Sequence, residues 1–281
     1  MPDYGARVVA LTDLRKGRQW LVTGPQSAQT SEDAVYGAGE AIGWDECFPT
    51  VLPCAHPAWA GPLRDHGALW GRKWAVVRAE PHCIETHFET PLFKFVRVLT
   101  AQGATVTADY RVSNLGTTPL PYLWSQHCLL ATNPGERIVV QGQSPMMAAD
   151  QPFDWPQHPD RDLRTIGPIS EGFAIKAYAT APGGASGGAS AAVIGPGGGL
   201  RFDWTDLPAL GIWLCYGGWP TGNGVHQVAL EPTTAMADHL NAAETLAQAR
   251  VLGPAETHRW SVRLTLTDPD SLNGPDERTL Q

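Results

Sequence analysis

The sequence has little charge, no basic cluster and no long apolar run, and each shortage excludes a class of protein. Only 17% of the 281 residues are charged, and the net charge is −8. No segment concentrates lysine or arginine as a nucleic-acid-binding surface requires. No apolar run reaches the roughly 18 residues of a bilayer-spanning helix, and the N-terminus lacks a basic stretch followed by an apolar one. We therefore expect a cytoplasmic protein that binds neither nucleic acid nor membrane.

Cysteine is also scarce, and its spacing is uninformative. The odd number of cysteines includes no Cys-x-x-Cys pair, so the set fits neither a disulfide framework nor a zinc-ligand motif. We expect reduced thiols and no metal at Cys47, Cys54, Cys83, Cys128 and Cys215.

What the sequence does contain is an alternation of apolar and polar residues with a period of two. It runs unbroken through Ala104–Val112 and again through Trp260–Thr267, as in strands with one buried face. Residues 93–99 are expected to pair with the first of these strands across the turn at Gln102-Gly103. Further short strands bounded by turn residues are predicted at 6–11, 18–23, 74–80, 83–88, 121–130, 172–179, 190–194, 200–204, 210–216 and 226–231.

Only residues 237–250 have a helical pattern, with Asp238 as a candidate N-cap. The chain is 43% hydrophobic and contains 30 glycines and 24 prolines, which suits a large core with many turns. The pattern therefore predicts an all-β protein, a large antiparallel β-sandwich with at most one or two short helices, built as a single domain over residues 1–281.

Glu231 is the first candidate for chemistry. It ends a strand-like run, and alternation places it on the face of Gln227 and Ala229, opposite the core-forming Val228 and Leu230. The small side chain of Ala229 leaves space beside the carboxylate of Glu231. The alternative is a solvent-exposed glutamate at the end of a strand.

Two histidines are the other candidates. His127 shares a strand face with Ser125 and Leu129, although a single histidine in a strand more often has a structural role. His66 follows Asp65 in a loop bounded by glycine, where a turn residue bonded to the nearby backbone is the alternative.

Five segments resemble aldose 1-epimerases of the galactose mutarotase-like superfamily, in the family's order and over most of the chain. They are DHGALWGRKW (65–74), PYLWSQH (121–127), GIWLCYGGWP (211–220), ALEPTTAMADHL (229–240) and LGPAETHRWSVRL (252–264). The resemblance implies the family's supersandwich fold and its activity, the interconversion of the α and β anomers of a free aldose. It also implies that Glu231 is the general base, His127 the general acid, and His66 a second ligand or proton donor.

This chemistry suits these residue types. One group takes the proton of the anomeric hydroxyl while another protonates the ring oxygen, and rotation and reclosure follow. The reaction requires no metal and no organic cofactor, and the expected partner is a small-molecule sugar bound by a monomer or homodimer. The alternative is a carbohydrate-binding protein without catalysis, because the same fold serves both functions.

Sugar recognition is expected to use aromatic faces, and the sequence contains eleven tryptophans. Trp70, Trp124, Trp213 and Trp219 lie inside the matching segments, although a buried core position is an equally good interpretation of each.

The chain departs from the best-known galactose mutarotases near its N-terminus, where residues 43–49 replace the family's arginine-containing segment. Asp45, Glu46 and the pair Arg72-Lys73 are the candidates to take over sugar contacts. The cationic pair also allows an anionic substrate, a phosphorylated or sulfonated sugar. Asp203 and Asp206 are weak candidates for a second acidic ligand.

Overall fold

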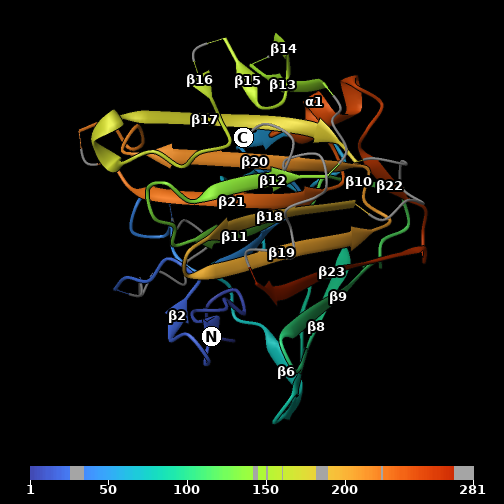
Figure 1. Cartoon of the computed structure of the whole chain (residues 1–281). Coiled ribbons are helices and arrows are strands. Elements are labelled where there is room, and N and C mark those ends of the chain that lie inside the picture. Colours follow the sequence, from blue (N-terminus) through green and yellow to red (C-terminus); the bar gives the residue numbers. More distant parts are fainter. Residues whose placement is uncertain are drawn as a thin grey trace.

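Two large antiparallel sheets dominate the fold (Figure 1). The computed structural model describes residues 1–25, 35–141, 145–149, 151–159, 161–181, 189–222 and 224–268. The first sheet has nine strands, which are, in spatial order, β16 (Arg161–Asp162), β15 (Gln157–His158), β14 (Gln151–Asp154), β13 (Pro145–Ala148), β17 (Phe173–Thr180), β20 (Ala209–Tyr216), β21 (His226–Thr233), β11 (Ser125–Leu130) and β3 (Trp44–Cys47).

The second sheet has eight strands and includes the long hairpin that extends from the body in Figure 1. In spatial order these are β12 (Arg137–Val140), β18 (Ala189–Gly195), β19 (Gly198–Thr205), β23 (Thr257–Thr267), β9 (Thr105–Asn114), β8 (Phe93–Gln102), β7 (Cys83–Glu89) and β6 (Ala75–Glu80). In the described ranges three small pairs complete the strands: β1 (Thr12–Asp13) with β2 (Arg18–Gln19), β4 (Cys54–Ala55) with β5 (Pro62–Leu63), and β10 (Leu120–Tyr122) with β22 (Arg250–Leu252).

The predicted all-β sandwich is confirmed, and so is its hairpin, in which β8 and β9 pair from Phe93–Asn114 to Gln102–Thr105. Helices within the described ranges are limited to α1 (Leu240–Thr245) and the 3-10 turn η1 (Ile169–Glu171). No described helix is long and apolar enough to span a membrane.

Several predicted boundaries were wrong. The helix expected over 237–250 keeps only six residues, and its N-cap is His239 rather than Asp238. The backbone carbonyl of Asp238 instead accepts hydrogen bonds from the N–H groups of Val51 and Leu52, outside the helix. Of the strand expected at 6–11, only Val8 forms a bridge. The segment 121–130 is divided between β10 and β11.

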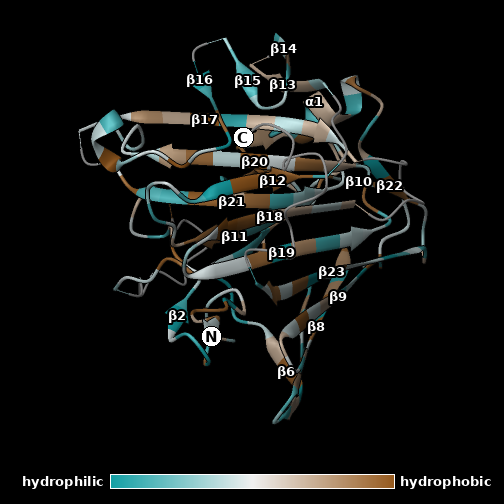
Figure 2. Ribbon diagram, viewed as in Figure 1, coloured by the Kyte–Doolittle hydropathy of each residue, from teal (hydrophilic) through white to brown (hydrophobic). Residues whose placement is uncertain are grey.

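The space between the sheets is filled by apolar side chains, and the hydrophobic strands β18 and β20 run through the body in Figure 2. Aromatic rings from both sheets meet there: Trp124 lies 4.9 Å from Trp260 and 4.8 Å from Tyr110, between ring centroids. Such offset and tilted contacts add to the free energy gained by burying the rings.

One carboxylate is embedded in this core. Glu46 accepts hydrogen bonds from Arg97 Nη1 at 2.9 Å, the Tyr110 hydroxyl at 3.0 Å, Trp124 Nε1 at 3.0 Å and Trp44 Nε1 at 3.1 Å. Burial raises the pKa of the Glu46 carboxyl to about 7, although the guanidinium of Arg97 acts in the opposite direction. The ion pair with Arg97 is thus the main compensation for removing the charge of Glu46 from water.

Replacing Arg97 with methionine is expected to cost about 3–5 kcal/mol of unfolding free energy, because it leaves the buried carboxylate without its counter-ion. Urea denaturation measures this cost. The double variant Glu46→Gln/Arg97→Met is expected to recover most of it, and Arg263→Met, at an exposed position of β23, to change stability by less than about 0.5 kcal/mol. An Arg97→Met variant as stable as the Arg263→Met control would contradict the assignment.

Candidate functional site

A cavity of about 220 Å³ lies on the face of the nine-stranded sheet that points away from the other sheet. The core-facing side chains of β21, Val228 and Leu230, point the other way. Acidic, basic and aromatic side chains line the cavity. The acidic and basic ones are Asp65, His66, His127, Lys176, Glu231 and Asp238, and the large aromatic ones are Tyr36, Trp213 and Trp219. Three of these residues are the predicted catalytic candidates.

The pairing of β11 with β21 sets the geometry of the cavity floor. Ser125 pairs with Thr233 and Leu129 pairs with Ala229, in one register that brackets His127 and Glu231. Both of these side chains line the cavity. The two candidates therefore reach one cavity from neighbouring strands.

Glu231 is 1% exposed and is held from two sides. Ser125 Oγ donates to its Oε2 at 3.0 Å, and the ammonium of Lys176 forms an ion pair with the same oxygen. Gly211 lies opposite Glu231 on β20, and a Cβ there would stand 3.4 Å from Cε of Lys176. The missing side chain therefore leaves room for the stem of Lys176.

The charge of Lys176 is retained despite its burial. Burial lowers the pKa of Lys176, but the carboxylates of Glu231 and Asp238 outweigh it, and the net shift is upward. An ammonium thus stands beside the carboxylate expected to act as base.

His127 is buried, and its Nδ1 lies 3.4 Å from the hydroxyl of Tyr36. Burial, followed by the neighbouring His66 and Lys176, lowers the pKa of His127 well below 6.5. The imidazole is therefore neutral at pH 7, whereas the role of general acid implied by the resemblance requires its protonated form.

His66 reaches the cavity from a loop between β5 and β6. Its Nδ1 lies 2.8 Å from Oδ1 of Asp65, and its ring stacks on Tyr36 with centroids 3.6 Å apart and planes 10° from parallel. The backbone of His66 is left-handed at φ 59°, and the next residue is Gly67 at φ 73°. Only glycine fits at position 67, since a Cβ on that residue would lie 2.1 Å from the carbonyl oxygen of Phe48.

Of the four tryptophans that were candidates for stacking on the sugar, two line the cavity and two do not. Trp213 and Trp219 line the cavity and meet edge to face at 6.5 Å. Trp70 is fully buried behind Tyr36, with its Nε1 donating to the carbonyl oxygen of Asp65 at 2.7 Å. Trp124 occupies the core on the other face of the sheet and does not reach the cavity.

Asp45 and Glu46, which were predicted to contact the sugar, instead each bind a buried arginine. Asp45 is buried and receives a bidentate contact from Arg7, whose Nη2 lies 2.6 Å from Oδ2. Glu46 points into the core toward Arg97. Adjacent residues of a strand face opposite ways, so each carboxylate needs its own arginine.

The cationic pair expected to bind an anion also lies away from the cavity. Lys73 is 81% exposed at its side chain and pairs with Asp3 at 3.1 Å, and Arg72 is absent from the described lining. The weak candidate Asp203 pairs with Arg201 on β19, and Asp206 stands in the turn after that strand. The carboxylates that accompany Glu231 in the described lining are those of Asp65 and Asp238.

Sequence reasoning missed Lys176, for which a signal existed: it is the single charged residue in the otherwise largely apolar segment Phe173–Ala179. It also missed Tyr36, whose surroundings give no comparable signal. Asp238 was interpreted as a helix cap, but its carboxylate accepts a hydrogen bond from the hydroxyl of Tyr178 and borders the cavity.

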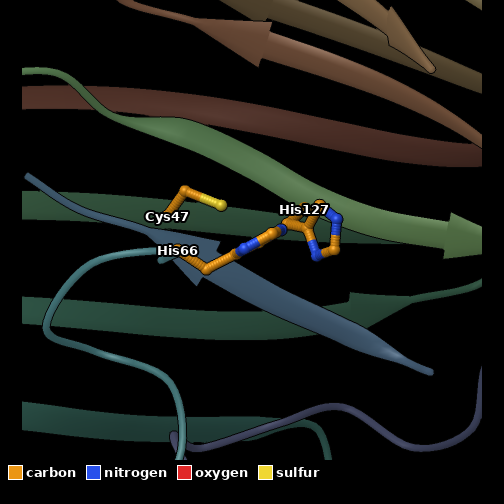
Figure 3. Close-up of side chains that lie close together, drawn as sticks. All are labelled: Cys47, His66 and His127. Atoms are coloured by element: carbon orange, nitrogen blue, oxygen red, sulfur yellow. The ribbon is translucent and has the colours of Figure 1, made fainter. Parts of the chain in front are cut away.

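Cys47 lies next to the two histidines, as Figure 3 shows. One ligand atom from each of Cys47, His66 and His127 lies within 4.8 Å of the others, which is the one group of three or more such side chains found in the described part of the chain. The thiol is fully buried, on the face of β3 shared by Asp45. These residue types are ligands of zinc and related cations.

The fold is shared with several solved structures. A protein of Synechocystis sp. PCC 6803 superposes with a TM-score of 0.72 at 16% identity, over 95% of this chain and 90% of that one. A galactose mutarotase related enzyme from Lactobacillus acidophilus gives 0.68 at 13% identity, over 96% and 94%. An aldose epimerase homologue from C. elegans gives 0.69 at 12% identity, over 95% and 94%.

No protein-family model and no curated protein matches the sequence. The likeness to solved structures nevertheless extends over nearly the whole chain and agrees with the resemblance of its five segments. The resemblance is thus confirmed at the level of architecture: this chain has the galactose mutarotase-like fold.

Proposed function

We propose that the chain is an aldose 1-epimerase, an isomerase that interconverts the α and β anomers of a free aldose. The observation that carries the proposal is the convergence of His127 and Glu231, from neighbouring strands, on one cavity that Trp213 and Trp219 also line. At about 220 Å³ the cavity is smaller than the 300–1,000 Å³ typical of drug-sized ligands. This size suits a single sugar ring.

In the proposed reaction, Glu231 accepts the proton of the anomeric hydroxyl while protonated His127 donates to the ring oxygen. The C1–O5 bond breaks, the aldehyde rotates about C1–C2, and the reverse proton transfers close the ring as the other anomer. Lys176 and Ser125 hold Glu231 in place through its Oε2. His66, oriented by Asp65, is the second donor to the sugar.

The charge of the cavity favours a neutral aldose. Its described lining holds three carboxylates, those of Asp65, Glu231 and Asp238, and one ammonium, which is already paired with Glu231. An anionic sugar would meet net repulsion there. The anionic substrate suggested by Arg72-Lys73 therefore has no support from the position of that pair.

Glu231→Gln and His127→Asn are each expected to lower the catalysed rate of anomer exchange by at least ~10²-fold, because each removes one of the two proton-transfer groups. Exchange NMR or polarimetry on fresh aldose solutions measures the rate after subtraction of the spontaneous reaction. Glu80→Gln and His82→Asn, at exposed positions of the distant hairpin, are the matched controls and are expected to retain full activity. Sugar binding without acceleration in the parent protein would identify a carbohydrate-binding protein instead.

The depressed pKa of His127 predicts the direction of the pH dependence. At pH values above that pKa, the protonated fraction of His127 grows as the pH falls, by up to about tenfold per unit, and the acid-catalysed rate grows with it. We therefore expect kcat to rise from pH 8 to pH 6 in the parent protein and this rise to disappear in His127→Asn. A parent kcat that falls over the same interval would rule out His127 as the acid.

Substrate charge provides a separate test. A neutral hexose is expected to show a kcat/KM at least ~10-fold above that of its 6-phosphate at low ionic strength, with the gap narrowing as salt screens the carboxylates. Both rates are corrected for spontaneous exchange. A preference for the phosphate would show that the cavity's charges do not select the substrate.

A further inference from the structure

We propose that Cys47, His66 and His127 form a binding site for a thiophilic divalent cation, with Zn²⁺ as the best fit, beside the cavity that the two histidines line. The three ligand atoms already lie within 4.8 Å of one another (Figure 3). Zn–S and Zn–N bonds of about 2.3 and 2.1 Å at tetrahedral angles place two donors roughly 3.5 Å apart. A closure of at most about 1.3 Å between any two donors therefore completes a tetrahedral arrangement.

The hydrogen bonds of the two imidazoles favour ligation. Asp65 engages Nδ1 of His66 at 2.8 Å, which leaves Nε2 as the ligand nitrogen. A carboxylate bonded to the far nitrogen of a metal-binding histidine is the usual outer-shell arrangement of zinc sites. Tyr36 stands 3.4 Å from Nδ1 of His127 in the same way.

The thiol of Cys47 supplies the third ligand. A cysteine thiol is largely protonated at neutral pH, so it loses its proton when it becomes a metal ligand. Binding follows the balanced step Cys–SH + Zn²⁺ → Cys–S⁻–Zn²⁺ + H⁺, in which the S–H bond breaks, the Zn–S bond forms and the proton leaves to solvent. Three protein ligands leave one tetrahedral position for water.

The site is independent of the proposed epimerase activity, because it requires only that these three side chains converge. If both proposals hold, the cation occupies the histidines that the reaction needs, and zinc inhibits anomer exchange. The two proposals therefore fail separately: metal binding is measured without substrate, and activity is measured in the presence of a chelator.

Titration of the reduced, tag-free protein with Co²⁺ and then Zn²⁺ tests the site. We expect one metal per chain, a thiolate-to-cobalt charge-transfer band, and release of a proton on binding. Cys47→Ser is expected to abolish the band and weaken Zn²⁺ binding by at least ~100-fold, and Asp65→Asn to weaken it by about 10–100-fold. Cys54→Ser, at a half-buried thiol outside the cluster, is the matched control and is expected to bind like the parent.

His66→Asn provides a second test, since it alters a loop residue rather than the core around Cys47, and is expected to weaken Zn²⁺ binding comparably. Absence of stoichiometric binding to the parent would overturn the site. The site would also be overturned if both Cys47→Ser and His66→Asn bound Zn²⁺ with the affinity of the parent protein, because the cation would then bind elsewhere.

Discussion

The antiparallel pairing of β11 with β21 is the contact on which the candidate site depends. It brings an imidazole and a carboxylate to one cavity on the outer face of the nine-stranded sheet, while the alternate residues of both strands fill the core. A shift of one residue in this register would move His127 into the core and bring an apolar side chain to the cavity. The hydrophobic side chains on the inner face thus fix the position of the polar ones on the outer face.

Much of the fold could be predicted from the sequence, because many strands have one buried and one partly exposed face and alternate accordingly. This holds for β9 and β23. It fails for β3, in which all four residues are buried and no alternation marks the strand. It also fails for β13 to β16, which are two to four residues long, too short to establish a period. Helix α1 was predicted too long because tertiary hydrogen bonds, absent from any local pattern, engage the backbone of Asp238 outside the helix.

The candidate site could be predicted in part. Glu231, His127 and His66 were named from local setting and family resemblance, and all three border one cavity. Asp45 and Glu46 were interpreted as sugar contacts because their arginine partners, Arg7 and Arg97, are distant in sequence. The proximity of Cys47 to the histidines was equally invisible, since the three residues come from a strand, a loop and a second strand that meet only in the folded chain.

The most direct measurement is the structure of the Glu231→Gln variant with an aldose bound. The account predicts a sugar ring between Trp213 and the two candidates, with its anomeric hydroxyl within hydrogen-bonding distance of residue 231 and its ring oxygen facing His127. A sugar bound elsewhere, or bound in this cavity with its anomeric carbon turned away from both residues, would contradict it.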